Sequence, residues 1–215
     1  MAPRRRPEQG GEALPRGRHS LPREAVAAIQ RARIRRAMVE VIGELGYPET
    51  RVLDVTAVAG VSRKTFYELF DSKEDCFLAI YDDLLGGLLA DTNAAMASAA
   101  GANWSERAAW GMRAVLEHLA RHPLEARFGI VEVLAAGPEA LARRDAALRR
   151  FAAFLDAGHT GSSSAAPTIA SLTVAGAVHE LLYGDIAHGA TAELPSRLPE
   201  LMSWILLPSS APRRA

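Results

Sequence analysis

Apolar residues recur three and four positions apart along most of the chain, and this spacing is typical of one face of an α-helix. The pattern is clear in residues 23–45, where Val26, Ile29, Ile34 and Met38 follow it. No long stretch shows the regular apolar–polar alternation of a half-buried strand. The chain is therefore predicted to be all-α.

Glycine and proline residues divide this pattern into about nine helices, because both residue types commonly end a helix. The predicted helices are residues 23–45, 52–59, 63–70, 73–97, 105–121, 124–136, 139–155, 168–187 and 197–207. Residues 158–167, which precede the eighth helix, have the small and polar composition of a flexible linker.

The segment GVSRKTFYELF, residues 60–70, combines a tight turn with a short helix. Gly60 suits the left-handed position that ends one helix, and Ser62 suits the N-cap of the next. On that next helix Phe66 and Phe70 fall on one side, together with Leu69, and are expected to face a core. The opposite side is therefore predicted to face solvent or a partner.

That outer side carries basic and hydroxyl groups, because Lys64 and Tyr67 point outward and Arg63 and Thr65 flank them. A helix-turn-helix places such a helix in the major groove of DNA. Arg and Lys pair with guanine or phosphate, and hydroxyl groups bind phosphate oxygens. The alternative is a solvated charged face on a purely structural helix.

Residues 46–77 resemble the DNA-binding signature of the TetR/AcrR family of transcriptional regulators. The matching residues are Gly46, Tyr47, Thr50, Val52, Asp54, Val55, Ala59, Gly60, Val61, Ser62, Thr65, Phe66, Tyr67, Phe70, Lys73 and Glu74. Two positions depart from the pattern. Arg51 stands where the family often has a second Thr, so Thr50 is expected to cap the helix that follows. Thr56 replaces a usual Ala and is small enough to pack.

The resemblance implies an N-terminal three-helix DNA-binding module on a larger helical body. Its predicted DNA contacts are Thr50, Arg51, Ser62, Arg63, Lys64, Thr65, Tyr67 and Lys73. The predicted regions are a disordered basic arm (1–22), a helix-turn-helix domain (23–72), a ligand-binding and dimerisation domain (73–208) and a disordered tail (209–215). Lys73 is expected to bind phosphate at the start of the helix after the module.

The resemblance also implies a homodimer on a pseudo-palindromic operator, usually a repressor that a small molecule releases from DNA. The last two helices, residues 168–187 and 197–207, are very apolar and are expected to form the dimer interface, although simple core packing is the alternative. The predicted lining of a ligand pocket is Tyr81, Leu85, Leu88, Trp110, Phe128, Phe151, Phe154 and Tyr183. An apolar lining favours a lipophilic ligand. A regulator controlled by a protein partner, or acting constitutively, is the second possibility.

Charge and composition narrow the picture further. The chain has 25 basic and 25 acidic residues, but residues 1–40 hold 10 basic against 4 acidic side chains, which favours contact with a polyanion at this end or a solvated arm. The basic N-terminus has no apolar segment behind it, and no apolar run is long enough to span a bilayer, so a cytoplasmic location and no membrane are expected.

Candidate chemistry is sparse elsewhere. The single cysteine, Cys76, excludes an intramolecular disulfide and is expected to be buried. His118 and His122 have a spacing that can bind a metal, with His179 or Glu180 as a conceivable third ligand, but two exposed histidines are the commoner explanation. No catalytic motif is present, so neither an enzyme nor a cofactor is expected.

Overall fold

The computed structural model describes residues 22–99, 101–160 and 167–206. Within these ranges the chain forms nine α-helices and three short π- or 3-10-helical turns, which confirms the predicted all-α class. The predicted arm up to residue 21, the tail 209–215 and residues 161–166 of the predicted linker lie outside the described residues. The domain boundaries drawn from the sequence stay predictions.

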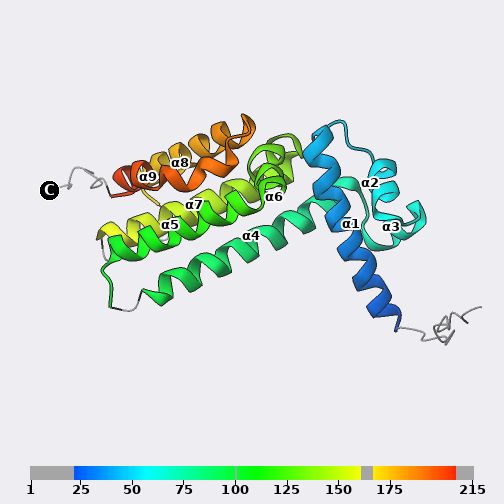
Figure 1. The fold of residues 1–215 in the computed structure, drawn as a ribbon, viewed down its shortest axis with the longest axis horizontal. Helices are drawn as coiled ribbons and strands as arrows, with labels where there is room; N and C mark the ends of the chain where they lie inside the picture. The colour runs from blue at the N-terminus through cyan, green and yellow to red at the C-terminus, as the bar shows by residue number, and fades with distance from the viewer. Residues whose placement is uncertain (1–21, 100, 161–166, 207–215) are drawn as a thin grey trace, which may run out of the picture.

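The helices form a small N-terminal module and an elongated body (Figure 1). The module consists of α1 (Arg23–Leu45), α2 (Val52–Ala59) and α3 (Arg63–Leu69). The body contains α4 (Lys73–Ser98), α5 (Trp104–Arg121), α7 (Pro138–Thr160), α8 (Ile169–Ala187) and α9 (Leu198–Ile205). In Figure 1, α2 and α3 lie on one side of α1, and the body extends from its other side.

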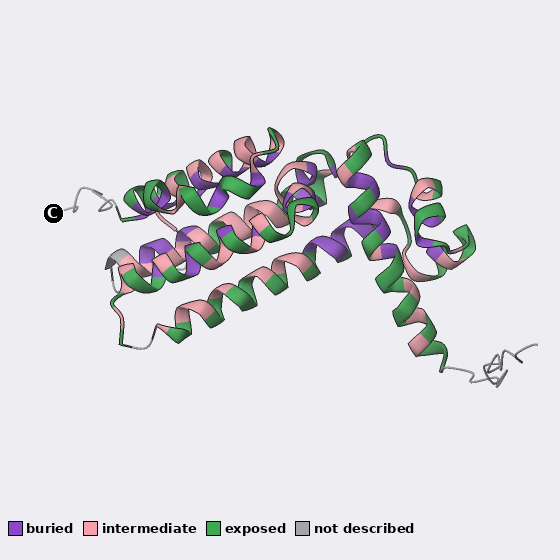
Figure 2. Ribbon diagram, viewed as in Figure 1, coloured by how far each residue is buried: buried purple, intermediate pink, exposed green. Residues whose placement is uncertain are grey.

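Buried residues gather in two clusters, and Figure 2 shows one of them where α1 meets the first turns of α4. This first cluster joins Ile34 and Ile42 of α1 to Phe66 of α3 and to Phe77 of α4, all of them fully buried. The second cluster belongs to the body and unites α5, α7, α8 and α9. Apolar burial of this extent is the main stabilising contribution to a fold of this kind.

The prediction of one continuous helix over residues 124–136 is wrong. The chain instead forms a short α6 (Pro123–Ala126), a π-helical turn η1 (Arg127–Val131) and a 3-10 turn η2 (Glu132–Ala135). Phe128 of η1 stacks on Phe77 with ring centroids 4.2 Å apart, so η1 belongs to the core of the N-terminal module. A π turn of this kind is rare and occurs mostly as a single-turn interruption of α-helical structure.

The predicted linker, residues 158–167, begins inside a helix, because α7 continues to Thr160. Gly158 does not provide flexibility there. Its α-carbon lies so close to the Trp104 indole that an added β-carbon would come within 1.7 Å of it. On the far side of the undescribed residues, Thr168 and Ser171 donate hydrogen bonds to the Asp156 carboxylate at 2.5–2.8 Å. These hydrogen bonds connect the C-terminal part of α7 to the N-terminal end of α8.

The end of the described chain also differs from the prediction. A 3-10 helix η3 (Thr191–Arg197) precedes α9, and α9 starts at Leu198, one residue later than expected. Arg197 forms a two-pronged ion pair with Asp185 of α8, at 2.9 and 3.0 Å, which holds the α8–α9 turn. No helix in the described parts of the chain is long and apolar enough to cross a membrane.

Candidate functional site

The turn between α2 and α3 has the geometry that the sequence predicts. Gly60 ends α2 with φ +61°, a left-handed conformation that glycine adopts without strain. Ser62 caps α3, because its Oγ accepts a hydrogen bond from the Thr65 backbone N–H at 3.0 Å. Phe66 is fully buried beneath α3 and fixes the helix against α1 and α2.

The outer face of α3 is exposed and basic. Lys64 has 86% of its side chain exposed and forms only a long ion pair, 3.7 Å, with Glu68 one turn later. Tyr67 is 49% exposed, and its ring meets the edge of Phe66 at a centroid distance of 5.4 Å. Arg63 is exposed as well, whereas Thr65 is half-buried. Exposed ion pairs of this kind are weak, so Lys64 is available to another anion.

The prediction that Thr50 caps α2 is wrong. Arg51, and not Thr50, is the N-cap of α2, and its backbone N–H donates to Asp54 Oδ2 at 3.0 Å. This hydrogen bond lowers the pKa of the Asp54 carboxyl from its ordinary value. Thr50 is buried, and its hydroxyl donates to the Gly46 carbonyl at 2.8 Å. The Arg51 side chain stays 78% exposed beside the start of α2.

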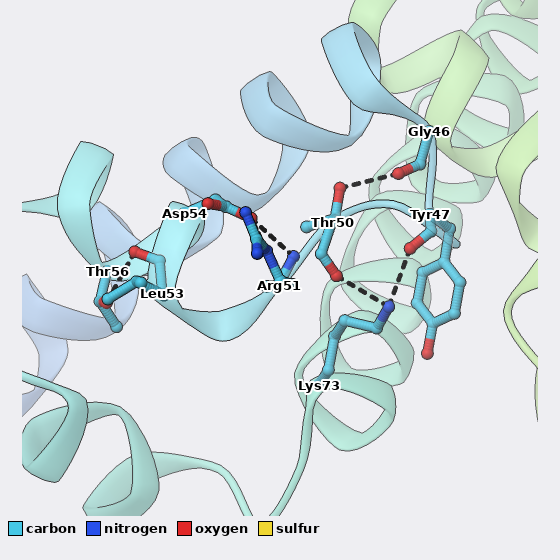
Figure 3. Close-up of polar contacts among 8 residues, drawn as sticks. All are labelled: Gly46, Tyr47, Thr50, Arg51, Leu53, Asp54, Thr56 and Lys73. Carbon is cyan, nitrogen blue, oxygen red and sulfur yellow. Dashed lines mark hydrogen bonds and ion pairs between the residues drawn. The ribbon is translucent and has the colours of Figure 1, made fainter.

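Lys73 is half-buried, and its side chain reaches the α1–α2 turn (Figure 3). Its ammonium donates hydrogen bonds to the carbonyl oxygens of Tyr47 at 2.8 Å and Thr50 at 2.9 Å, and it lies 4.0 Å from the centroid of the Tyr47 ring. Burial lowers the pKa of this ammonium from its ordinary value. Lys73 therefore joins the start of α4 to the α1–α2 turn, and its contact with phosphate stays a prediction.

Glu132 is a functional candidate that the sequence prediction missed. This buried carboxylate accepts the Tyr47 backbone N–H at 2.8 Å and pairs with Arg127 at 3.0 Å. It connects η2 of the body with the same α1–α2 turn that Lys73 holds. Its position as the one acid in the apolar run Ile130–Ala136 was a usable signal, because buried carboxylates are rare unless paired.

A cavity of about 390 Å³ lies in the body, between the two buried clusters. Five of the predicted lining residues reach it: Tyr81, Leu85, Leu88, Phe151 and Phe154. Its size is within the range of small-molecule sites, about 300–1,000 Å³, and most of its wall is apolar.

The other three predicted lining residues lie elsewhere. Trp110 is 52% exposed on the outer side of α5. Phe128 stacks on Phe77 and does not line the cavity. Tyr183 is half-buried on α8 but does not reach the cavity. Whether each of these side chains points into the cavity depends on how its helix is oriented relative to distant helices. No local sequence pattern gives that orientation.

The cavity wall has a polar pair, formed by the half-buried Arg144 of α7 and the buried His179 of α8. Arg144 Nη2 lies 3.3 Å from His179 Nδ1, and Arg144 Nη1 donates to Asp145 at 3.0 Å. Burial and the neighbouring Arg144 charge lower the pKa of His179 to about 4, so the ring is neutral near pH 7. The sequence pattern suggests His179 only as a conceivable metal ligand, and it gives no prediction for Arg144.

The metal alternative finds no support in the described residues, where no group of three or more His, Cys, Asp or Glu side chains is placed to hold an ion. His118 instead lies 3.4 Å from Asp91, and its ring is 4.8 Å from that of His122. Cys76 is buried as predicted, and burial raises the pKa of its thiol to about 12.

Comparison with known proteins places the N-terminal module in a family. Residues 34–80 match the family described as bacterial regulatory proteins, tetR family. The N-terminal module therefore belongs to this TetR family, whose members are DNA-binding transcriptional regulators and not enzymes. No curated protein matches the chain by sequence.

Solved structures of similar fold include the fatty acid degradation regulator FadR from Bacillus halodurans, with a TM-score of 0.70 and 18% identity over 86% of this chain and 97% of that one. FadR from Bacillus subtilis in complex with stearoyl-CoA has a TM-score of 0.69 and 20% identity, over 84% and 98% of the two chains. PfmR from Thermus thermophilus, a TetR family regulator, has a TM-score of 0.60 and 22% identity, over 81% and 97%.

Proposed function

We propose that the protein is a dimeric transcriptional repressor that binds a pseudo-palindromic operator through α3 and is released by a small lipophilic ligand. The exposed basic face of α3, on a helix capped and packed as a recognition helix requires, carries the DNA-binding part of this proposal. Arg51, Arg63, Lys64, Thr65 and Tyr67 are the side chains proposed to contact DNA. Such a role also implies a location in the cytoplasm, with the DNA.

The ligand part of the proposal is supported by the apolar cavity in the body. A cavity of this volume would be costly to keep empty, because its lining residues lose packing contacts. One protein of similar fold was crystallised with stearoyl-CoA, a ligand with a long apolar chain. These observations favour a ligand-controlled regulator over one that lacks an effector.

The dimer is proposed to form through α8 and α9. Ile169 and Leu172 of α8 and Trp204 and Leu206 at the end of α9 are exposed although they are large and apolar. Gly176 leaves open space above α8, since a β-carbon there would meet no atom within 4 Å, and a partner helix could approach closely. Ala175, by contrast, is fully buried and lines the cavity, so it is not available to a partner.

Helix α6 and the η1 turn lie between the cavity and the N-terminal module. Ala126, Gly129 and Ile130 line the cavity. On the opposite side, Leu124 is so close to Gly43 of α1 that an added β-carbon would lie 2.7 Å from it. We propose that a ligand shifts this segment and so changes the spacing of the two α3 helices in the dimer, provided that it binds the off-DNA arrangement more tightly.

The experiment that tests this function is footprinting of the purified protein on DNA flanking its own coding region, at fixed salt and with scrambled competitor DNA. Protection of a two-fold-symmetric site with half-sites about one helical turn apart is expected. Weak binding that ignores sequence and falls steeply with salt on every fragment would contradict the operator-binding repressor.

A further inference from the structure

The cavity wall contains two buried hydrogen-bond donors that no protein atom satisfies. Arg144 Nε and His179 Nε2 both lie away from solvent without a hydrogen-bond partner. Both residues line the cavity, and His179 is only 7% exposed. Buried polar groups without a partner are uncommon, because each one destabilises the fold that contains it. Their presence in a cavity wall therefore points to a polar group on the cavity's occupant.

The hydrogen-bonding pattern identifies what kind of group this is. A guanidinium only donates, so the contact between Arg144 Nη2 and His179 Nδ1 requires Nδ1 to be the acceptor. In the neutral ring the proton then resides on Nε2, which makes Nε2 a donor. Arg144 Nε is also a donor. The partner of both atoms must accept hydrogen bonds, and an oxygen atom fits this requirement.

The charge of the site is nearly balanced. Asp145 pairs with Arg144 at 3.0 Å, and His179 is neutral. A neutral carbonyl oxygen and a carboxylate are therefore both acceptable, whereas a cation would face two donors and the guanidinium charge. Other polar side chains reach the wall, among them Glu125, His118 and Arg150, but none of them has a buried unpartnered atom.

The remainder of the wall can hold an extended apolar group. Tyr81 and Arg144 lie in the early parts of α4 and α7, which Arg143 and Asp82 join by an ion pair of 2.6 Å. Met96 and Phe154 line the cavity near the opposite ends of the same two helices. An occupant that satisfies Arg144 and His179 at one end can therefore place an apolar chain along α4 and α7.

We infer that Arg144 and His179 bind the carbonyl oxygen of an acyl ligand, an apolar chain carrying a carboxylate or a thioester, inside this cavity. The inference rests on the proposed ligand-controlled function and names the chemistry of its effector. Arg144 and His179 are positioned to select ligands by their oxygen acceptor, while the apolar wall accepts the chain. The same two donors are expected to make a lipophilic cation bind more weakly than an acyl ligand of equal chain length.

Isothermal titration of the full-length protein with three ligands of equal chain length tests this inference. Dodecanoate and dodecanoyl-CoA carry the acyl oxygen, and dodecyltrimethylammonium carries the same chain on a cation. The acyl ligands are expected to bind at least about tenfold more tightly than the cation, because the net free energy of one hydrogen bond to a charged donor corresponds to about this ratio of dissociation constants. The tighter of the two acyl ligands identifies the source of the acyl group. Equal affinity for the cation, or no binding of either acyl ligand, overturns the inference.

Variants separate the two donors from the rest of the cavity. His179→Leu and Arg144→Met are expected to weaken acyl binding about tenfold each, without weakening the cation. His179→Gln keeps a hydrogen-bond donor and is expected to bind acyl ligands nearly as tightly as the wild type. The His179→Leu and His179→Gln pair therefore tests the inference even if Arg144→Met does not fold. Arg149→Met, an exposed neighbour on the same helix that does not reach the cavity, is the matched control. Unchanged acyl binding in folded His179→Leu overturns the inference.

Release from DNA is measured separately, so that the two proposals fail independently. An acyl ligand that binds through Arg144 and His179 but leaves the protein on its operator upholds this inference and contradicts the ligand-released repressor. Release by an acyl ligand that acts equally on wild type and both variants supports the repressor and overturns the role of the two donors.

Discussion

At the scale of single residues, the two lysines of the chain occupy opposite environments. Lys64 points into solvent from α3, while Lys73 is held by two carbonyl oxygens and the Tyr47 ring. The two lysines lie only nine residues apart, so residue type alone does not separate a DNA contact from a structural one. Hydrogen-bond partners separate them, because a lysine with its donors already engaged has less to offer a phosphate.

The double variant Lys64→Ala/Tyr67→Ala is expected to lose DNA affinity without unfolding. Base contacts are worth about 1–3 kcal/mol each, whereas exposed substitutions change stability by about 0.5 kcal/mol or less. Fluorescence anisotropy on the footprinted site and thermal melting measure the two effects. Arg113→Ala, an exposed basic residue of α5, is the control. If the double variant binds DNA as tightly as the wild type, α3 is not the recognition helix.

Lys73→Met is expected to lower the free energy of unfolding by about 1.5–3 kcal/mol, because its charged hydrogen bonds to Tyr47 and Thr50 are lost. Urea denaturation measures this loss. The same variant tests the predicted phosphate contact through the salt dependence of DNA binding. A slope of log affinity against log salt that decreases by about one indicates that Lys73 also neutralises a phosphate. An unchanged slope restricts Lys73 to its structural role.

His179 is expected to make stability depend on pH in the acidic range. Its pKa is about 4 in the folded protein and near 6.5 when unfolded, owing to burial and the Arg144 charge, with Asp145 opposing them. The unfolded chain binds the proton first, so this contribution is complete above pH 6.5 and is lost as the pH falls towards 4. The slope is at most about 1.4 kcal/mol per pH unit. Denaturation from about pH 7 to about pH 4.5 should show a smaller slope in His179→Gln, and equal slopes would contradict a neutral buried His179.

At the scale of secondary-structure elements, η1 is the segment where the two parts of the molecule meet. Phe128 packs in the core of the N-terminal module, and Gly129 and Ile130 line the cavity. Arg127 pairs with Glu132, which in turn accepts the Tyr47 N–H. A movement of the cavity wall therefore has a direct physical connection to the α1–α2 turn.

Removal of the Glu132 carboxylate is expected to loosen this connection. In Glu132→Ala the buried Tyr47 N–H loses its acceptor, at a cost of about 1–3 kcal/mol. Hydrogen exchange should show reduced protection of the Tyr47 amide and of the start of α2. Glu139→Ala, which removes an exposed carboxylate from α7, serves as the comparison. Equal protection of the Tyr47 amide in both variants would show that Glu132 does not hold the turn.

At the scale of the whole molecule, α8 and α9 leave large apolar side chains uncovered on one chain. Leu172→Glu is expected to produce a monomer with weakened operator binding, because an unpaired charge in an apolar interface is strongly unfavourable. Light scattering after gel filtration measures the mass. Leu141→Glu is the matched control, since Leu141 of α7 is 38% exposed and Leu172 is 37% exposed. A dimer that persists in Leu172→Glu would move the interface away from this part of α8.

The structure of the helix-turn-helix in the N-terminal module could be predicted from local features of the sequence. Gly60, Ser62 and the spacing of Phe66 and Phe70 act through neighbours within four residues, so the turn, the cap and the buried side of α3 could be predicted from local rules. The all-α class could be predicted for the same reason, because helical periodicity is a local property of the chain.

The arrangement of the body depends instead on tertiary packing. Trp110, Phe128 and Tyr183 resemble pocket residues by type, yet the orientation of distant helices turns each of them away from the cavity. The pairing of Arg144 with His179 joins residues 35 positions apart, and that of Glu132 with the Tyr47 amide joins residues 85 apart. Such contacts depend on how whole helices pack, and no spacing within a segment encodes them.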